Sequence, residues 1–324
     1  NWVYDILPTV EEQDEKFGFV DVGHGEKVQV EFVSANPTGL LHMGNARGGA
    51  LGDSLANLLK MAGYDVTKEF YINDAGNQIV NLGLSLEARY RQELGEVDYP
   101  FPEKGYHGKD IIDTAKRIIA EVGDSYLALP EEERQQKMIA TALDEKISAI
   151  KSGLKDFGVE YDVWFSETSL HESGAVKEVV DLLTEKGLTY EKEGAIWLKT
   201  TEFGEEKDEV LVRSNGIPTY FAADIAYHKN KYDRGFKRVI NIWGADHHGH
   251  VARLQAALDG LGLDGSHRLV VVLMQLVNLL QDGQPVRMSK RTGKAIALND
   301  LLDEINVDAA RYYFNNRAST SPLD

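Results

Sequence analysis

The sequence predicts an α/β protein whose parallel β-sheet is split by a long, largely helical insertion. The chain opens with a strand, a loop, a helix and a second strand, and such a crossover predicts parallel strands. The same order returns in the last third of the chain, after a long charged stretch with a helical pattern. The segments are strands at 28–33 and 66–72 around a helix at 45–62, and strands at 237–243 and 268–277 around a helix at 248–261.

The opening unit has a clear pattern in each element. Residues 28–33 (VQVEFV) alternate and then run apolar, as a buried strand does. Residues 45–62 place apolar side chains at helical spacing, and Gly63 suits the position after a helix end. Ligands of parallel sheets gather at the carboxyl ends of the strands, so the loop after 28–33 is a predicted site.

The middle and the end of the chain predict further elements in order. Residues 77–158 are largely helical in pattern, and VWFSE after them predicts a strand. A helix near 169–186 precedes two short strands around the turn KEG, and Asn215-Gly216 indicates another hairpin. After 281, a loop rich in Gly, Lys and Arg leads to two helices, LNDLLDEI and VDAARYYFNNRA.

These elements divide the chain into four parts. The last residues, STSPLD, carry no stop signal, so we expect a piece of a longer protein. The parts are 1–90, the first half of a nucleotide-binding sheet domain; 91–204, the insertion; 205–280, the second half; and 281–324, the basic loop and the start of a helical region.

The composition bounds the class of protein. With 324 residues, 43% of them hydrophobic, the chain can bury a sizeable core. It has no Cys, which excludes disulfides and Cys-bound zinc. No apolar run reaches the roughly 20 residues that span a bilayer, and the start is no signal peptide, so we expect a soluble, cytoplasmic protein. A net charge of −17 disfavours non-specific nucleic-acid binding but allows a localised basic groove.

The first of three clusters with chemical potential is SANPTGLLHMGNARG, residues 34–48. A glycine-containing loop that enters a helix offers backbone N–H groups and the positive end of the helix dipole to a phosphate. His42 and Asn45 add side-chain donors there. By itself, such a segment is more often a turn with a helix cap. The chain has neither GxxxxGK[ST] nor GxGxxG.

The second cluster is WGADHHGH, residues 243–250, directly after a predicted strand. One interpretation is a strand-end turn that contacts a nucleotide, and another is a helix cap at Asp246. A metal hydrolase is a third interpretation, with His247, His248 and His250 as ligands. The cluster lacks the Glu that stands between the histidines of HExxH.

The third cluster is VRMSKRTGK, residues 286–294. Its cations and glycine suit a loop that closes over polyphosphate through Lys290 or Lys294, although a solvated basic loop has the same composition. The joint occurrence of three such clusters, two of them at strand ends, favours nucleotide chemistry over the separate alternatives.

The sequence also resembles the class I aminoacyl-tRNA synthetases. HMGN at 42–45 is similar to their HIGH signature, and RMSKR at 287–291 is similar to their KMSKS loop. Within that class it resembles the bacterial arginyl-tRNA synthetases over nearly the whole chain, in EFVSANPTG, NDAGNQI, PTYFAADIAYH, WGADHHGH, MSKRTG and VDAARYYF. The resemblance implies a Rossmann-like sheet of the HUP type, with 91–204 as the connective polypeptide and 281–324 as the KMSKS-like loop and the start of the stem-contact region.

The resemblance implies His42, Asn45 and Lys290 as catalytic residues. Lys290 would stabilise charge on the triphosphate while the carboxylate of arginine attacks the α-phosphate. Asn45 departs from the family pattern, which has a second His there, and Asn carries no charge. Arg287 replaces the first Lys of the loop. The implied ATP site comprises His42, Gly44, Asn45, Gly244, Asp246, His247, Met288, Ser289 and Lys290, without protein ligands to a metal.

The implied arginine site agrees with the chemistry of a guanidinium, which prefers planar, bidentate acceptors such as carboxylates. Tyr220 and Asp224 are one helical turn apart and share a face. In the family these positions hold the substrate side chain, whereas by themselves they are typical of local hydrogen bonds at a helix start. The implied arginine-binding residues are Glu31, Ser34, Asn36, Tyr220, Asp224 and His248.

The resemblance therefore implies a catalytic domain that makes arginyl-adenylate from L-arginine and ATP with Mg²⁺, then transfers arginine to the 3′-terminal ribose of tRNA(Arg). We expect a monomer that contacts no membrane and lacks the N-terminal and anticodon-binding domains of the family. A non-catalytic arginine sensor or RNA-binding relative is one rival, but it would have lost His42 and Lys290. A nucleotidyltransferase is another, and it would not need the arginine-site phrases.

Overall fold

The structure is a computed structural model. It describes residues 2–275, 277, 280–281, 284–285 and 297–323. Met288, Ser289 and Lys290 of the basic loop lie outside the described residues.

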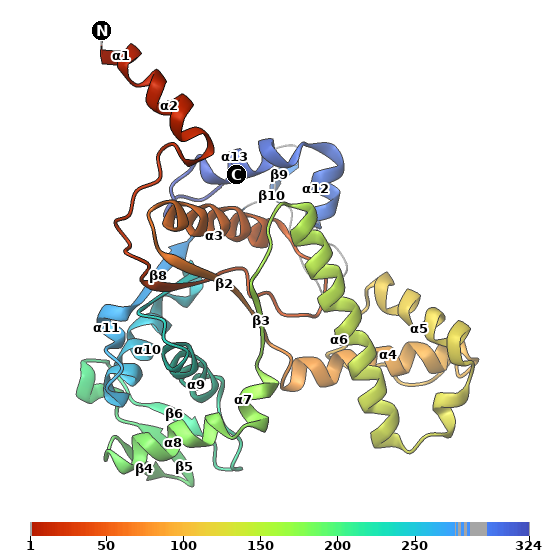
Figure 1. Ribbon diagram of the computed structural model, residues 1–324. Coiled ribbons are helices and arrows are strands. Elements are labelled where there is room, and N and C mark those ends of the chain that lie inside the picture. The colour runs from red at the N-terminus through yellow and green to blue at the C-terminus, as the bar shows by residue number, and fades with distance from the viewer. Residues whose placement is uncertain (1, 276, 278–279, 282–283, 286–296, 324) are drawn as a thin grey trace.

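A parallel sheet lies at the centre of the described chain (Figure 1). Its five strands follow the order β3-β2-β1-β7-β8, and every neighbouring pair is parallel. The predicted α/β class and the parallel pairing are confirmed. The strands are β1 (Lys27–Glu31), β2 (Asp65–Ile72), β3 (Val163–Ser166), β7 (Arg238–Gly244) and β8 (Leu269–Met274).

The sheet has two unlike faces. Val28 and Val30 of β1 belong to the apolar core beneath helix α3 (Met43–Met61), and strand alternation turns Glu31 to the opposite face. There Glu31 stands opposite Glu69 of β2 and opposite Asn241 of β7. All three side chains are buried, so a row of polar side chains crosses three adjacent strands.

The apolar face is covered by α3, α12 (Leu298–Glu304), α13 (Val307–Asn315) and the C-terminal turns of α6 (Glu131–Asp156). Helix α3 lies very close to the chain after β1, since a Cβ at Gly52 would lie 2.1 Å from Cγ of Phe32. The predicted helix at 45–62 is confirmed, and it starts two residues earlier because the chain turns into it at the preceding His.

The polar face is covered by α9 (Tyr220–Asp233) and α10 (His248–Leu261), which share a core with α8 (Ala175–Glu185). The hairpin predicted at KEG is confirmed by the pairing of Lys192 with Ala195. The small antiparallel sheet beside these helices consists of β4 (Thr189–Lys192), β5 (Ala195–Leu198) and β6 (Glu209–Val212).

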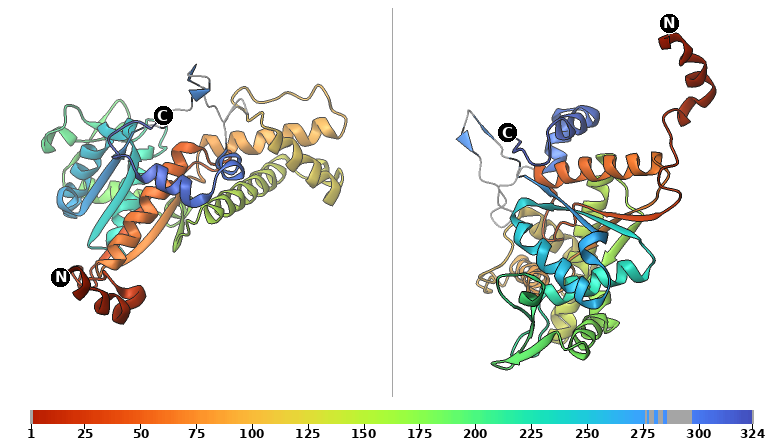
Figure 2. Two further views of the ribbon diagram at one scale, coloured as in Figure 1. Left: turned by 90° about the horizontal axis from the view of Figure 1, so that it is seen from above. Right: turned by 90° about the vertical axis from the view of Figure 1, so that its left-hand side faces the viewer.

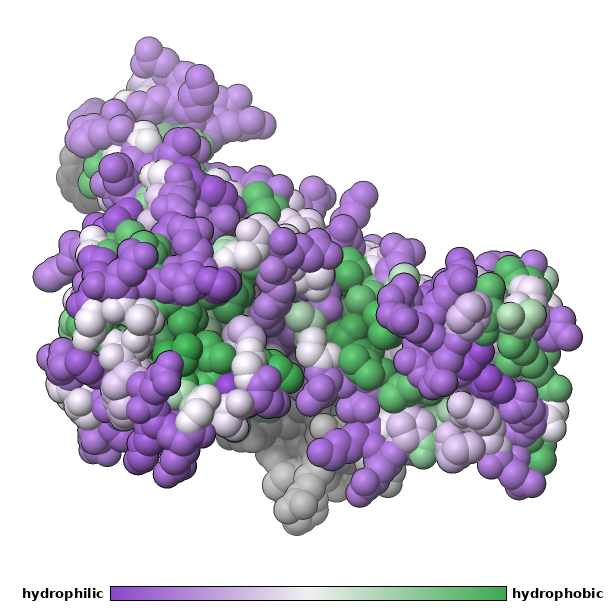
Figure 3. All heavy atoms as spheres, turned by 90° about the horizontal axis from the view of Figure 1, so that it is seen from below, coloured by the Kyte–Doolittle hydropathy of each residue, from purple (hydrophilic) through white to green (hydrophobic). Residues whose placement is uncertain are grey.

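Helices α4 (Asn77–Glu93) and α5 (Lys109–Val122) form an arm with the N-terminal part of α6. The arm has its own small core and projects to one side of the sheet domain (Figures 1 and 3). The domain boundaries remain a prediction. Within the expected insertion, 91–204, the chain returns to the central sheet at β3.

The remaining elements are short. Helices α1 and α2 precede β1 and extend away from the body (Figure 2). Among the described residues, no helix has both the length and the apolar character needed to cross a bilayer. The short elements are α1 (Trp2–Asp5), α2 (Leu7–Gln13), α7 (Thr168–Glu172), α11 (Gly265–Arg268), β9 (Leu280–Gln281) and β10 (Gln284–Pro285).

Candidate active site

A cavity of about 1060 Å³ opens where the strands of the parallel sheet end. Its wall includes residues that directly follow β1, β2, β3, β7 and β8, together with the first turns of α3 and α9. The carboxyl edge of a parallel sheet is where ligands of this architecture bind. The cavity therefore lies where the order of strands and helices predicts a site.

The turn after β1 has an unusual backbone. Val33 and Ser34 both have positive φ, 68° and 39°, although neither is glycine. Such conformations are strained, above all for a β-branched residue, and they gather at functional sites. The turn brings the Ser34 hydroxyl back to the sheet, where it donates to Oε1 of Glu31 at 2.9 Å and accepts from the backbone N–H of Tyr71 at 3.1 Å.

The start of α3 faces the cavity. His42 is the N-cap residue, and Oδ1 of Asn45 accepts from its backbone N–H at 3.0 Å, so the two residues form a capping box. A Cβ at position 44 would lie 3.2 Å from Cε1 of His42, which favours glycine there. The positive end of a 19-residue helix is thereby directed at the cavity, an arrangement that attracts phosphate.

The turn after β7 forms the wall on the other side. The ring of Trp243 lies 5.8 Å from that of His247 and 5.5 Å from that of His250. A Cβ at Gly244 would lie 2.4 Å from Oδ1 of Asp246, so a side chain there would require the exposed Asp246 carboxylate to shift. This turn thus combines a flat aromatic surface with an open backbone and an exposed carboxylate.

Asp224 places a carboxylate on the cavity wall from the second turn of α9. Its Oδ1 lies 3.0 Å from Nδ1 of His228, and its Oδ2 lies 2.5 Å from Nε2 of His250. Burial alone would raise the pKa of Asp224, but the two histidines outweigh burial and hold that pKa far below its ordinary value. Asp224 is therefore ionised at neutral pH.

The carboxylates around the cavity outnumber the cations that pair with them. Lys231 pairs with Glu31 at 2.6 Å, and Arg234 pairs with Glu69 at 2.6 Å. Asp224 and Glu167 both line the cavity as well and are contacted only by histidines among the described ion pairs. With neutral histidines, these four carboxylates exceed Lys231 and Arg234 by two negative charges. Arg253, which also lines the cavity, is paired with Glu209, and the exposed Asp246 on the wall adds a further negative charge.

Tyr71 lies among these carboxylates. Burial, then the charges of Glu167, Asp224 and Glu31, raise the pKa of its phenol well above the ordinary value. The hydroxyl therefore keeps its proton at neutral pH and can donate it to Glu167. The region as a whole favours a positively charged ligand.

Most of the predicted site residues that the structure describes lie on the wall of this one cavity. His248 differs, because it is exposed at the first position of α10 and does not line the cavity. His250, two residues further along the helix, lines the cavity instead. Ser34 and Glu31 already bond to each other and to other protein groups. The predicted residues on the wall are Glu31, Ser34, Asn36, His42, Gly44, Asn45, Tyr220, Asp224, Gly244, Asp246 and His247.

Several residues that line the cavity were not predicted from the sequence. Asn73, Glu167 and Gln275 each follow the end of a parallel strand, so the rule that ligands bind at the carboxyl edge could have identified them. Asn73, in the amide orientation that satisfies its neighbours, donates to Oε2 of Glu167 at 3.3 Å. Tyr71 is the last-but-one residue of β2, and no signal in the sequence separates it from an ordinary strand residue.

Two histidines of the second cluster contact other protein side chains. His250 contacts Asp224, and His247 lies beside Trp243 and Asp246. In the part of the chain that the structure describes, no three side chains of His, Asp or Glu are arranged to hold a metal ion.

Comparison with known proteins gives a consistent result. Residues 7–321 match the family described as tRNA synthetases class I (R), catalytic domain. An arginine–tRNA ligase of Carboxydothermus hydrogenoformans is 61% identical over 324 residues, which cover all of this chain and 58% of that protein. The chain thus spans a little more than half the length of this curated relative.

Solved structures agree. A structure from Campylobacter jejuni, assigned there as an arginyl-tRNA synthetase, is 38% identical with a TM-score of 0.90, and the match covers 99% of this chain and 70% of that one. The arginyl-tRNA synthetase of Thermus thermophilus is 20% identical with a TM-score of 0.67, over 92% of this chain and 60% of that one, and supports the fold alone. The expected fold class and the family resemblance are confirmed.

Proposed function

Since the chain belongs to the catalytic-domain family of the class I arginyl-tRNA synthetases, we propose that it activates L-arginine with ATP and transfers the arginine to tRNA(Arg). The observation that carries this proposal is the placement of Asp224. It is an ionised carboxylate beside an excess of buried negative charge, on the wall of the cavity that also receives the start of α3.

The arginine side chain would bind at Asp224. A carboxylate can accept two parallel N–H bonds from one guanidinium, and its oxygens keep acceptor capacity besides their histidine contacts. Tyr220 lies at the mouth of the cavity on the same helical face, with its side chain 55% exposed, so it can close over a bound ligand. Glu167 is the second carboxylate that the cavity offers to a cation.

The backbone end of arginine would lie toward the turn after β1. Asn36 faces the cavity there, and its amide donates to Oε1 of Gln78 at 3.2 Å. The Ser34 hydroxyl is already used twice within the protein, so we expect Ser34 to position Glu31 and the strained turn, with substrate contacts falling to the backbone of the turn.

ATP would bind across the start of α3 and the turn after β7. The positive end of α3 and His42 would receive the phosphates, and the open backbone at Gly244 would receive the adenosine. Lys290, Met288 and Ser289 lie outside the described residues, so their roles remain predictions.

The chemistry needs mainly positioning and charge stabilisation. The carboxylate oxygen of arginine attacks the α-phosphorus, the bond to pyrophosphate breaks, and arginyl-adenylate forms. A ribose hydroxyl of tRNA then attacks the activated carbonyl carbon, and AMP leaves. Both small substrates would bind in one cavity, so their reacting atoms would be held close together in a fixed orientation.

Mg²⁺ finds no site built from three acidic or histidine side chains in the described residues. Mg²⁺ generally binds through substrate phosphates and few protein ligands, so we expect it to arrive on ATP, and we assign it no step. The monomeric state and the cytoplasmic location expected from the sequence also remain predictions.

Calorimetric titration with L-arginine and with citrulline, its neutral near-isostere, tests the proposal. We expect the affinity for arginine to exceed the affinity for citrulline at least about tenfold, because a hydrogen bond to a charged group contributes about 1.5–3 kcal/mol. Asp224→Asn should remove the difference. Asp181→Asn, an exposed carboxylate that pairs with Lys177, is the matched control and should keep it. Equal binding of the two ligands by the unmodified protein would contradict the proposed substrate.

A further inference from the structure

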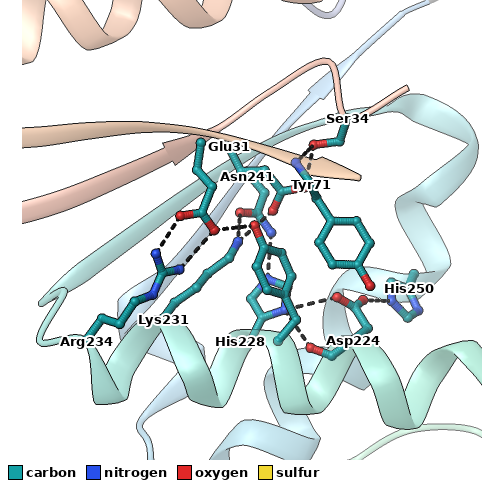
Figure 4. A network of polar contacts seen from close by, with 11 residues as sticks. Glu31, Ser34, Tyr71, Asp224, His228, Lys231, Arg234, Asn241 and His250 are labelled. Atoms are coloured by element: carbon teal, nitrogen blue, oxygen red, sulfur yellow. Dashed lines mark hydrogen bonds and ion pairs between the residues drawn. The ribbon is translucent and has the colours of Figure 1, made fainter. Parts of the chain in front are cut away.

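A chain of buried hydrogen bonds runs beneath the cavity and ends at Asp224 (Figure 4). Nζ of Lys231 donates to Oε2 of Glu31 at 2.6 Å and to Oδ1 of Asn241 at 3.1 Å. The amide nitrogen of Asn241 lies 2.7 Å from Nε2 of His228. Nδ1 of His228 lies 2.8 Å from the backbone oxygen and 3.0 Å from Oδ1 of Asp224. Lys231, Asn241 and His228 are each 0% exposed.

The direction of every bond in this chain follows from Lys231. An ammonium group can only donate, so the atom of Asn241 that faces it must be the carbonyl oxygen. The amide NH₂ of Asn241 must then face His228, and it can only donate. Nε2 of His228 is therefore an acceptor without a proton, and the ring proton sits on Nδ1, directed at Asp224.

This tautomer suits the carboxylate of Asp224. With the proton on Nδ1, His228 directs one donor at both the backbone oxygen and Oδ1 of Asp224, and His250 contacts the other carboxylate oxygen. With the proton on Nε2, a ring lone pair would face the carboxylate, and two donors would face each other at Asn241. His228, Asn241 and Lys231 do not line the cavity themselves. Asn241 and Lys231 reach Asp224 through His228, and Lys231 also pairs with Glu31 of the cavity wall.

We propose that Lys231, Asn241 and His228 form a positioning relay, which fixes the Nδ1–H tautomer of His228 and thereby holds Asp224 as an oriented carboxylate acceptor for the guanidinium. The ligand in this statement rests on the proposed function, whereas the tautomer does not. The relay explains why α9 carries a lysine and a histidine on its buried face, where a helix ordinarily carries apolar residues.

The tautomer can be measured directly in the ligand-free protein. Long-range ¹H–¹⁵N correlation spectra of the ¹⁵N-labelled full chain distinguish a protonated ring nitrogen from one with a free lone pair, and His228→Asn identifies the signal. At pH 7 we expect Nδ1 protonated and Nε2 free. Asn241→Asp, which keeps the shape but presents acceptors on both sides, should move a proton onto Nε2. A protonated Nε2 in the unmodified protein overturns the proposal.

Two substitutions of His228 test what the relay does for binding. The amide of Asn takes the place of Nδ1, and the amide of Gln takes the place of Nε2. We therefore expect His228→Asn to keep the preference for arginine over citrulline within about threefold, and His228→Gln to reduce it about tenfold or more. Thermal unfolding of both variants verifies that they fold.

The outcomes separate the two proposals. Equal preference for arginine in both His228 variants would show that the ring only fills space, and would overturn the relay. If the unmodified protein fails to prefer arginine although His228 has the expected tautomer, the proposed substrate is wrong and the relay stands as a device that orients Asp224 for another cation.

Discussion

The two faces of the central sheet carry different kinds of side chain on the same three strands. Beneath α3, β1, β2 and β7 present mainly apolar side chains such as Val30, Phe70 and Ile240. The described exception on β2 is Lys68, which pairs with Asp53 of α3 at 3.0 Å. Beneath α9 the neighbouring positions present Glu31, Glu69 and Asn241 in one register. Each side chain of this row is hydrogen-bonded to a group on α9.

The difference shows that stability and pre-organisation are separated across the thickness of one sheet. Apolar burial contributes about 25 cal/mol per Å² and needs no partner, so the α3 face stabilises the fold robustly. Buried charges are retained only where each is paired, and a buried ion pair often contributes little net stability. The α9 face is thus better suited to fixing the site than to holding the fold together.

The largest expected loss of stability comes from leaving one charge of the α9 face unpaired. Lys231→Met removes the partner of Glu31, and we expect it to lower the free energy of unfolding by about 3–5 kcal/mol, because the carboxylate remains buried. Urea unfolding measures the change. The double variant with Glu31→Gln should recover part of the loss, and additive effects of the two substitutions would show that the pair is not coupled.

Two tyrosine hydroxyls, one on each face, allow the faces to be compared by removing a single oxygen atom from each. Tyr227 donates to Oε1 of Glu69 at 2.6 Å on the α9 face, and Tyr161 donates to the backbone oxygen of Phe32 at 2.9 Å on the α3 face. A bond to a charged group is the stronger one, so we expect Tyr227→Phe to lower the free energy of unfolding by about 1.5–3 kcal/mol and Tyr161→Phe by about 0.5–1.5 kcal/mol. Equal losses in chemical denaturation would remove the distinction between the faces.

Two glycines of α3 test how tightly the apolar face is packed. A Cβ at Gly52 would lie 2.1 Å from Phe32, so Gly52→Ala should lower the free energy of unfolding by about 1–3 kcal/mol. At Gly49 the nearest atoms, on Phe157 and Val159, are 3.7 Å away, so Gly49→Ala should be neutral or raise it by up to about 1 kcal/mol. Thermal unfolding of the pair gives the comparison, and a harmless Gly52→Ala would contradict the close approach of α3.

The smallest expected effect concerns pH. The pKa of Asp224 is lowered in the folded protein relative to its ordinary value of 3.8, so its contribution to stability is fully present above that value and is lost as the pH falls through the folded pKa. The relevant quantity is the stability difference between the unmodified protein and Asp224→Asn as the pH is lowered from 5. Below pH 4 it should narrow by at most about 1.4 kcal/mol per pH unit.

Urea unfolding at a series of pH values measures this difference. A gap that widens on acidification would mean that Asp224 is protonated more readily in the folded protein than in the unfolded one. That result would contradict the lowered pKa of Asp224 in the folded protein.

Local patterns in the sequence were enough to predict most elements of the central sheet and the place where a site would form. Apolar alternation in 28–33, helical spacing in 45–62 and the glycine-rich turns are local properties, so they were readable without knowing which elements touch. The rule for parallel strands then located the cavity at the strand ends, and the wall there includes His42 and Asp224.

The pairing of the charged side chains, by contrast, depends on contacts between distant parts of the chain. Lys231 and Glu31 are 200 positions apart, and Arg234 and Glu69 are 165 apart, so no local pattern indicates that they meet. His250 rather than His248 reaches Asp224 because α10 begins at His248 and its turn sets the direction of each ring. Pairing of buried charge depends on which helix face packs on which strand, and that is settled by the packing of the whole domain.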